Sequence, residues 1–178
     1  MNYLVQSLTY FRIIIAPVIF LLVTFYNFYG WALFLFIAAS SSDYWDGFLA
    51  RKYNLESALG EVTDPIADKI LVTFLILALS IELSSIFFAF AGGLILVREF
   101  WVSALRDLNA RTSNLEATRV SFLSKFKTVI QFITFASFLL GLYLNNSLII
   151  FISNFFLFLA LLITIKTGLS YTIGTFKK

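Results

Sequence analysis

The 178-residue sequence contains neither cysteine nor histidine. Without cysteine, the chain can form no disulfide, no thiolate nucleophile and no cysteine-based metal site. Without histidine, a Ser-His-Asp triad, histidine-ligated zinc and an imidazole proton shuttle are excluded as well. Acid–base or metal chemistry must therefore use carboxylates, assisted by Lys, Arg and hydroxyl groups. Ligation by oxygen alone favours hard divalent cations such as Mg²⁺ or Mn²⁺.

Charged residues are also scarce, at 13% of the chain against 60% hydrophobic residues. A soluble domain of this size is about one quarter charged. Several apolar runs reach the roughly 20 residues that a membrane-spanning helix needs. Hydropathy predicts about six spans, at 10–28, 30–50, 62–81, 84–106, 121–143 and 147–168. We therefore expect an all-α integral membrane protein with a single transmembrane domain, residues 1–178.

Basic residues occur in alternate connections between the predicted spans. Lys and Arg lie at Arg12, within 51–69, within 98–127 and at the C-terminal end, whereas "YNFYG", "SIELSS" and "LNNS" contain none. Because basic segments of membrane proteins face the cytoplasm, this pattern places both termini there, in agreement with an even number of spans. We expect a multi-pass protein whose polar segments open to the cytoplasm.

Four aspartates fall between the second and third predicted apolar runs. One group has the helical spacing i, i+3, i+4, i+7 and comprises Asp43, Asp46, Gly47 and Ala50. A second group has the spacing i, i+4, i+8 and comprises Gly60, Asp64 and Asp68. The turn at 52–59 is short enough to make the two helices antiparallel neighbours, so the acidic faces would meet. An aspartate at the centre of a span costs about 2.5–3.5 kcal/mol, so a divalent cation is the simplest compensation.

The small residues on these faces have two interpretations. Gly47, Ala50 and Gly60 would let two helix backbones approach closely, as small residues do throughout membrane proteins. They would equally leave room for a flat ligand beside the acids. The residues alone leave both interpretations open.

The full pattern Asp43-x-x-Asp46-Gly47-x-x-Ala50-Arg51, eight residues, Gly60-x-x-x-Asp64-x-x-x-Asp68 resembles the complete signature of the CDP-alcohol phosphatidyltransferases. The segments "LTYFRIIIAPV", "TDPIADKILV", "VREFWVSALRD" and "SKFKTVIQF" are most similar to family members that use sn-glycerol-3-phosphate. One departure is the start, "MNYLVQS", which lacks the Pro-Asn usual ahead of the first span. The resemblance implies the six-helix fold of this family.

The resemblance also implies a reaction and the residues that perform it. The phosphatidyl group of CDP-diacylglycerol would pass to sn-glycerol-3-phosphate, giving phosphatidylglycerophosphate and CMP for phospholipid biosynthesis in a bacterial inner membrane. The implied ligands of Mg²⁺ or Mn²⁺ are Asp43, Asp46, Asp64 and Asp68, and Asp68 would also take the acceptor's hydroxyl proton. The implied donor-binding residues are Gly47, Ala50, Arg51 and Gly60. Membrane lipids are expected partners, a homodimer is compatible with the family, and no nucleic acid is expected.

An anionic acceptor requires cations near the metal site. The available ones near the cytoplasmic ends of the fourth and fifth spans are Arg98, Arg106, Lys125 and Lys127. Glu99, Ser103 and Arg106 share a helical face, which predicts that Glu99 orients Arg106. A purely structural Arg–Glu pair is the alternative for these two residues.

Two other functions remain open. A different member of the family, such as one that forms cardiolipin, would use another acceptor with the same acidic motif. A divalent-cation carrier is the alternative from another class, because intramembrane acids mark ion pathways. The acids of this chain cluster at one membrane level, however, and the other predicted spans show no series of acidic residues that could form an ion pathway. This favours the enzyme.

Overall fold

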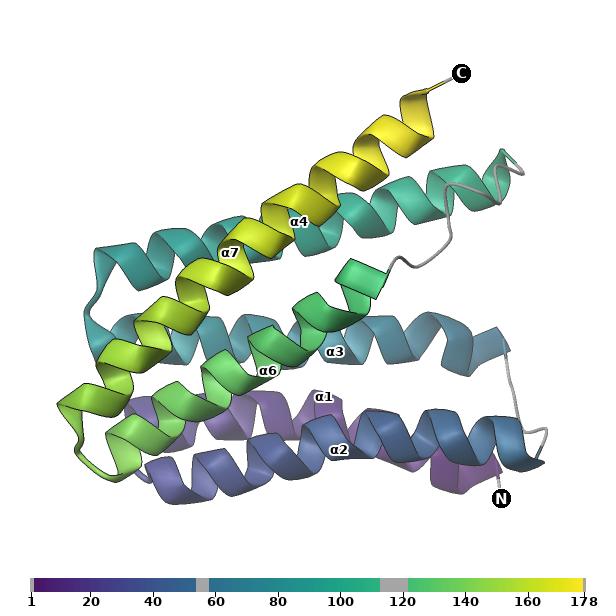
Figure 1. Ribbon diagram of the computed structural model, residues 1–178. Helices are drawn as coiled ribbons and strands as arrows, with labels where there is room; N and C mark the ends of the chain where they lie inside the picture. The colour runs from purple at the N-terminus through teal and green to yellow at the C-terminus, as the bar shows by residue number, and fades with distance from the viewer. Residues whose placement is uncertain (1, 54–57, 113–121, 178) are drawn as a thin grey trace.

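The computed structural model describes residues 2–53, 58–112 and 122–177, with side chains described except at 2–6, 43–53, 58, 59, 61, 62, 122 and 125. Over these residues the chain forms six helices, shown in Figure 1 with the labels used below. They are α1 (Asn2–Thr24), α2 (Tyr29–Tyr53), α3 (Ala58–Leu83), α4 (Ile86–Arg111), α6 (Phe122–Tyr143) and α7 (Ser147–Phe176). The expected all-helical fold is confirmed.

Three tight turns at one end of the bundle reverse the chain between helices (Figure 1). Each turn contains one residue with a positive φ, namely Asn27 (54°), Ser84 (46°) and Asn145 (47°). Asparagine adopts this left-handed conformation more readily than most residues, because its short side chain bonds locally to the backbone. Ser85 and Asn146 then cap α4 and α7 by accepting hydrogen bonds from backbone N–H groups of the first turn.

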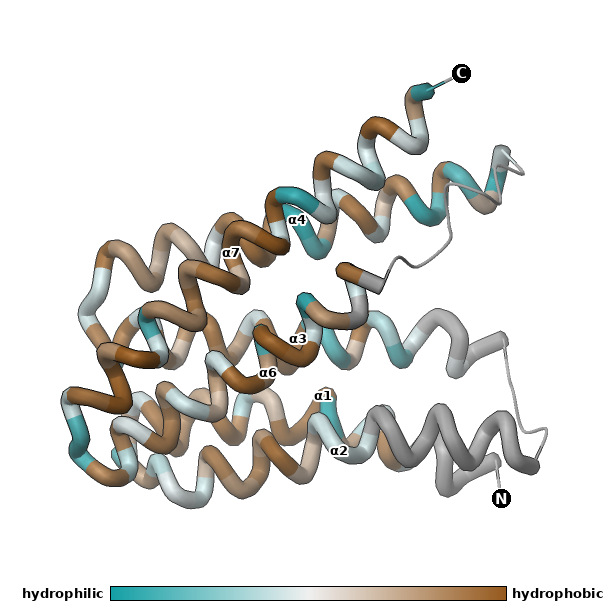
Figure 2. The backbone as a smooth tube through the Cα atoms, viewed as in Figure 1, coloured by the Kyte–Doolittle hydropathy of each residue, from teal (hydrophilic) through white to brown (hydrophobic). Residues whose placement is uncertain are grey.

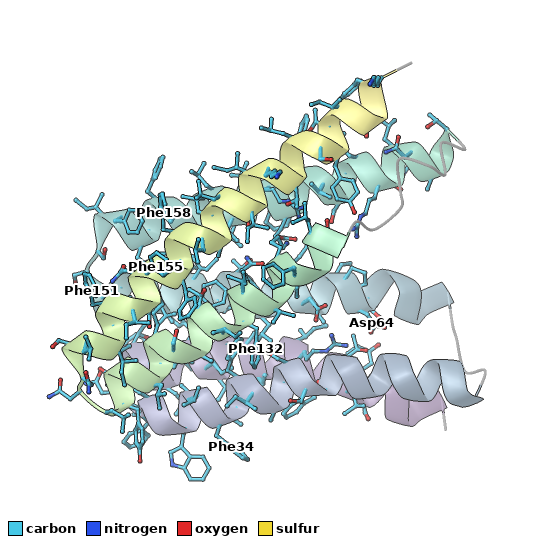
Figure 3. All side chains as sticks on the ribbon, viewed as in Figure 1. Phe34, Asp64, Phe132, Phe151, Phe155 and Phe158 are labelled. Carbon is cyan, nitrogen blue, oxygen red and sulfur yellow. The ribbon has the colours of Figure 1, made fainter. Side chains whose placement is uncertain are left out.

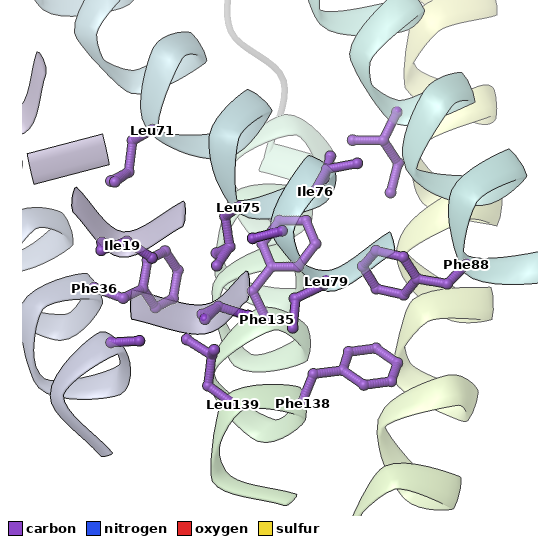
Figure 4. Packing of buried hydrophobic residues seen from close by; sticks show 14 of the residues in the cluster. Ile19, Phe36, Leu71, Leu75, Ile76, Leu79, Phe88, Phe135, Phe138 and Leu139 are labelled. Carbon is purple, nitrogen blue, oxygen red and sulfur yellow. The ribbon is translucent and has the colours of Figure 1, made fainter. Parts of the chain in front are cut away.

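The helices pack as a closed ring within the described part of the chain. α1 packs against α2 and α3, α2 against α6, α6 against α7, α7 against α4, and α4 against α3. Aromatic side chains fill the centre, where Phe88 meets Phe138 edge to face at 5.0 Å between ring centroids (Figure 4). Phe36 stacks on Phe132 at 5.1 Å. Since each helix contributes to one shared core, movement of any helix would disturb the whole ring.

The outer surface of the bundle is apolar. Phe151, Phe155 and Phe158 lie along α7 (Figure 3) and are all exposed. Hydrophilic positions of α4 and α7 instead gather toward the end that holds the C-terminus (Figure 2). An exposed apolar belt of this kind suits lipid, because lipid removes the penalty of exposing apolar groups to water.

Four helical segments among the described residues are long and apolar enough to cross a membrane: Ser7–Thr24, Ile86–Arg111, Phe126–Tyr143 and Ser147–Phe176. α2 adds a shorter apolar segment, Tyr29–Ser42. Each of the six helices overlaps one predicted span, although α1 begins and ends earlier than the predicted 10–28 and α7 extends beyond 168. α2 and α3 depart from simple spans because the acidic motif occupies their adjoining ends. The chain is a multi-pass integral membrane protein.

The close approach of α3 and α4 generates a stability prediction. A Cβ atom at Gly92 would lie 2.6 Å from Cγ2 of Ile76, whereas a Cβ at Gly93 would meet nothing within 4 Å. Because overpacking a close helix contact costs about 1–3 kcal/mol, Gly92→Ala should lower the melting temperature of the detergent-purified protein. Gly93→Ala, the matched control, should leave it unchanged or slightly higher. Equal melting temperatures for the two variants would contradict this packing.

Candidate active site

Two acids of α3 share one buried arginine of α1. Arg12 Nη1 donates to Asp68 Oδ1 at 2.5 Å, and Arg12 Nη2 lies 3.5 Å from Asp64 Oδ1. Thr9 Oγ1 also donates to Asp64 Oδ1, at 2.5 Å. The Arg12 side chain is 0% exposed, while those of Asp64 and Asp68 are 32% and 47% exposed. The guanidinium therefore holds the two carboxylates from the inside and leaves part of each accessible from outside the core.

The sequence of α1 explains why an arginine lies there. Within the described side chains of α1, one face is buried and comprises Thr9, Arg12, Ala16, Ile19 and Val23, at the spacing expected for a single helical stripe. Its apolar part packs into the central core, and its polar end reaches the acids of α3. A charge buried without a partner costs several kcal/mol, so the contacts with Asp64 and Asp68 stabilise this polar end.

The other half of the acidic motif lies in α2. Asp43, Asp46, Gly47, Ala50 and Arg51 are helical, as predicted, but their side chains are outside the described set. Among the side chains that are described, no three acids come together as a metal-binding group. α2 and α3 run antiparallel, as predicted (Figure 1), but close packing between them is not found in the described part of the chain, where α1 packs against both. The predicted metal-binding and donor-binding roles of these α2 residues stay predictions.

A basic cavity of about 310 Å³ adjoins Asp68 between α3, α4 and α6. Its charged lining residues are Asp68, Lys69, Arg98, Glu99, Arg106 and Lys127. Three of the four cations predicted from the sequence to bind an acceptor are therefore brought together, and the fourth, Lys125, lies outside the described side chains. The cavity holds four cations against two acids, which leaves a surplus of two positive charges.

The contacts inside the basic cavity correct one expectation. Glu99 does not orient Arg106: it pairs with Lys127 Nζ of α6 and lies 3.4 Å from Arg98 Nη1. Arg106 instead turns toward α7, where its Nη2 donates to the hydroxyl of Tyr171 at 3.0 Å. The Arg106 guanidinium carbon also lies 5.2 Å from the centroid of the Tyr171 ring. The reason is that Lys127 of α6 reaches Glu99, whereas α7 packs directly against α4 and brings Tyr171 to Arg106.

An apolar cavity of about 340 Å³ lies on the other side of Asp68, between α2, α3 and α6. Its apolar lining residues are Phe36, Leu71, Val72, Val129, Phe132 and Phe135. Its polar lining residues are Ser40, Ser41, Asp68, Thr128 and Gln131. Asp68 and Gln131 line both cavities, so a single wall separates a basic chamber from an apolar one. On this wall Gln131 Nε2 is buried and has no partner among the described residues.

Several residues of this arrangement were not predicted as site residues, among them Thr9, Arg12, Lys69 and Tyr171. Arg12 did carry a usable signal, because a charge inside a predicted apolar span is by default a candidate for function. Lys69 carried the same signal, as a charge inside the predicted span 62–81, whereas Tyr171 carried none, since its importance depends on which helix packs beside it.

Comparisons with known proteins agree with this geometry. Residues 3–166 match the CDP-alcohol phosphatidyltransferase family. The chain belongs to this family. It is 38% identical over 181 residues to the CDP-diacylglycerol–glycerol-3-phosphate 3-phosphatidyltransferase of Rickettsia typhi, covering 96% of each chain. The protein of the same name from Rickettsia prowazekii is 38% identical, over 92% of this chain and 90% of its own. That from Salmonella choleraesuis is 35% identical over 72% of each chain.

As a CDP-alcohol phosphatidyltransferase, the protein is a membrane enzyme of phospholipid biosynthesis whose donor is CDP-diacylglycerol. Members of this family are generally metal-dependent. The described part of the site fits a hard divalent cation, because Asp64 and Asp68 offer carboxylate oxygens one helical turn apart and remain partly exposed. The fixed guanidinium of Arg12 offsets part of their charge and limits their mutual repulsion.

The Arg12 contacts predict a specific loss of stability. Arg12→Gln removes a buried charge that bonds two carboxylates, which should cost about 1–3 kcal/mol, or about 3–10 °C in melting temperature. Thermal unfolding in detergent with excess chelator measures this without a contribution from bound metal. The matched control is Arg111→Gln, because Arg111 pairs with Asp107 at 2.9 Å on the exposed surface and such pairs contribute little. Equal decreases in melting temperature in the two variants would show that the buried contacts of Arg12 stabilise the fold no more than an exposed ion pair does.

Proposed function

We propose that this protein is a phosphatidylglycerophosphate synthase, which transfers the phosphatidyl group of CDP-diacylglycerol to sn-glycerol-3-phosphate and releases CMP. The observation that carries the proposal is the basic cavity beside Asp68. The relatives from Rickettsia and Salmonella are named for the same acceptor, which supports the proposal.

The charge of the basic cavity suits a phosphate monoester. Lys69, Arg98, Arg106 and Lys127 outnumber Asp68 and Glu99 by two charges, and a phosphate monoester carries about −1.5 to −2 at neutral pH. The volume of about 310 Å³ is at the lower end of the range for small-molecule pockets. A neutral alcohol would leave the surplus positive charge uncompensated, so the cavity favours an acceptor that carries a phosphate.

Asp68 is the proposed proton acceptor. It lines the basic cavity, so a glycerol hydroxyl whose phosphate is held by the cations can lie against its carboxylate. Arg12 fixes the orientation of this carboxylate through the bond to Oδ1. Because a carboxylate is a weak base, its contribution comes from position and from taking the proton late, as the oxygen attacks phosphorus.

The proposed donor site adjoins the same carboxylate from the side of α2. Asp43, Asp46, Asp64 and Asp68 are the proposed ligands of Mg²⁺ or Mn²⁺, which would neutralise the donor's phosphate oxygens and make CMP a better leaving group. Gly47, Ala50, Arg51 and Gly60 remain the proposed contacts of the donor nucleotide.

The apolar cavity suits an acyl chain of the donor. Its walls are aromatic and aliphatic side chains, and its polar lining includes Asp68 and two serines of α2, Ser40 and Ser41. A lipid whose phosphates lie at the acids could therefore extend one chain into this cavity. The burial of each methylene there would contribute about 0.8 kcal/mol to donor binding.

The proposed orientation follows from the charges. Arg12 contacts the acids of α3, and Arg98, Arg106 and Lys127 line the cavity beside Asp68, so by the positive-inside rule this end of the bundle would face the cytoplasm. Water-soluble sn-glycerol-3-phosphate would then reach the basic cavity from the cytoplasm of a bacterial cell, and the donor would enter from the inner membrane.

A direct assay tests this function. Purified protein in detergent, supplied with CDP-diacylglycerol and Mg²⁺, should release CMP with sn-glycerol-3-phosphate and far more slowly with glycerol or phosphatidylglycerol. Excess chelator should stop the release, and added Mg²⁺ or Mn²⁺ should restore it, because the donor's charge would otherwise be uncompensated.

Two results of the assay would contradict the proposal. Faster turnover with phosphatidylglycerol than with sn-glycerol-3-phosphate would identify a cardiolipin-forming enzyme. Full turnover in excess chelator would remove the metal from the mechanism.

A further inference from the structure

A line of hydroxyl groups runs along the face of α7 that packs against α4. Its members share one helical face and are Thr164, Thr167, Tyr171, Thr172 and Thr175. Four of them accept hydrogen bonds from side chains of α4. Arg98 donates to Thr167 at 2.8 Å and Arg106 donates to Tyr171 at 3.0 Å. Trp101 donates to Thr172 and Asn109 donates to Thr175, each at 2.9 Å. Two of these four donors are the arginines of the basic cavity.

Arg98 is held against α7 along its whole length. Its guanidinium donates to Thr167 Oγ1, and that hydroxyl in turn donates to the backbone carbonyl of Ile163 at 2.8 Å. The guanidinium carbon lies 5.8 Å from the centroid of the Tyr171 ring. The aliphatic part crosses Gly168, where a Cβ atom would lie 3.0 Å from Arg98 Cγ. With only 10% of its side chain exposed, Arg98 has little freedom to leave this position.

Arg106 depends on Tyr171 more completely. Arg106 is exposed. Among the described residues, its side-chain hydrogen bond and its ring contact are both with Tyr171. An exposed arginine loses up to about 2 kcal/mol of rotamer entropy when it is fixed by a ligand. The buried ring of Tyr171 removes part of that freedom before any ligand arrives, which leaves a phosphate less entropy to offset on binding.

We propose that Thr167 and Tyr171 are positioning residues that hold the guanidinium groups of Arg98 and Arg106 for an acceptor's phosphate. In this way α7, which contributes no charge to the basic cavity, sets the preference for a phosphate-bearing acceptor over a neutral alcohol. The inference rests on the proposed function, since it concerns how the same cavity selects its acceptor.

Conservative hydroxyl removals test the proposal. Tyr171→Phe keeps the ring beside Arg106 and removes the hydrogen bond that Arg106 donates. Thr167→Val keeps the shape of the side chain and removes the hydrogen bond that Arg98 donates. Each should raise the KM for sn-glycerol-3-phosphate about 5- to 20-fold, less than the loss of a direct charge-assisted contact. The kcat value and the KM for CDP-diacylglycerol should stay within about two-fold of wild type.

Two matched controls lie on the same helix. Thr164 is buried one turn from Thr167, but its hydroxyl has no side-chain or backbone partner among the described residues, so Thr164→Val should leave all kinetic constants unchanged. Gly168→Ala should raise the acceptor KM by displacing Arg98, whereas Gly174→Ala should not, because a Cβ there meets nothing within 4 Å.

A second readout separates positioning from general weakening of the fold. Inorganic phosphate should compete with sn-glycerol-3-phosphate, and Tyr171→Phe and Thr167→Val should weaken its inhibition by the same factor as they raise the acceptor KM. The ratio of activity with sn-glycerol-3-phosphate to activity with glycerol should fall by that factor too. A variant that raises both substrates' KM values and lowers the melting temperature would show a structural role and overturn the inference.

Lys127→Ala separates a failure of the positioning role from a failure of the proposed function, because Lys127 lines the basic cavity without contacting α7 in any described interaction. If wild-type protein uses sn-glycerol-3-phosphate and Lys127→Ala raises its KM while Tyr171→Phe and Thr167→Val do not, the positioning role alone is overturned. If wild-type protein does not use this acceptor at all, the proposed function is overturned and the inference with it.

Discussion

A guanidinium buried inside an apolar helix bundle needs compensating charge within hydrogen-bonding distance, and Arg12 obtains it from two carboxylates of α3. This requirement favours the observed rotation of α1 and α3 relative to one another, because it brings Asp64 and Asp68 to the guanidinium. The core below Arg12 then follows from the same faces, with Ala16 and Leu75 both fully buried in the central cluster. The bond to Arg12 also determines which way Asp68 points.

The position of Asp68 explains how one small membrane protein could bring a lipid donor and a water-soluble acceptor together. Its carboxylate lies on a wall common to an apolar cavity and a basic cavity. The two substrates we propose differ in the same way, since one is mostly hydrocarbon and the other is a compact anion. The reacting phosphorus and hydroxyl would therefore meet where the two environments meet, beside the group proposed to take the proton.

The sequence predicted the helices and much of the site, for identifiable reasons. Helical spacing places Asp64 and Asp68 on one face, and the structure has both in contact with Arg12. The clustering of basic residues in 98–127 likewise brought Arg98, Arg106 and Lys127 into one cavity. Their roles in metal and acceptor binding remain predictions, as do those of the α2 aspartates.

Partners across helices were not predictable in the same way. The spacing within α4 suggested that Glu99 orients Arg106, yet Glu99 pairs with Lys127 and Arg106 with Tyr171. A one-dimensional pattern determines the face of a helix on which a residue lies, but not the helix that packs against that face. The partners of Arg12 in α3 and the contribution of α7 therefore depend on how the ring of helices is assembled.

The kinetics of Asp68→Asn, in detergent with saturating Mg²⁺, test the central claim that this carboxylate is the proton acceptor between the two cavities. The amide is nearly isosteric, still accepts the hydrogen bond of Arg12 and cannot take the proton, so kcat should fall about 10²- to 10⁴-fold while the melting temperature falls no further than in Arg12→Gln. Donor binding, measured separately, should survive better than in Asp43→Asn, where a proposed metal ligand is lost. A kcat near wild type, or equal loss of donor binding in both variants, would contradict the account.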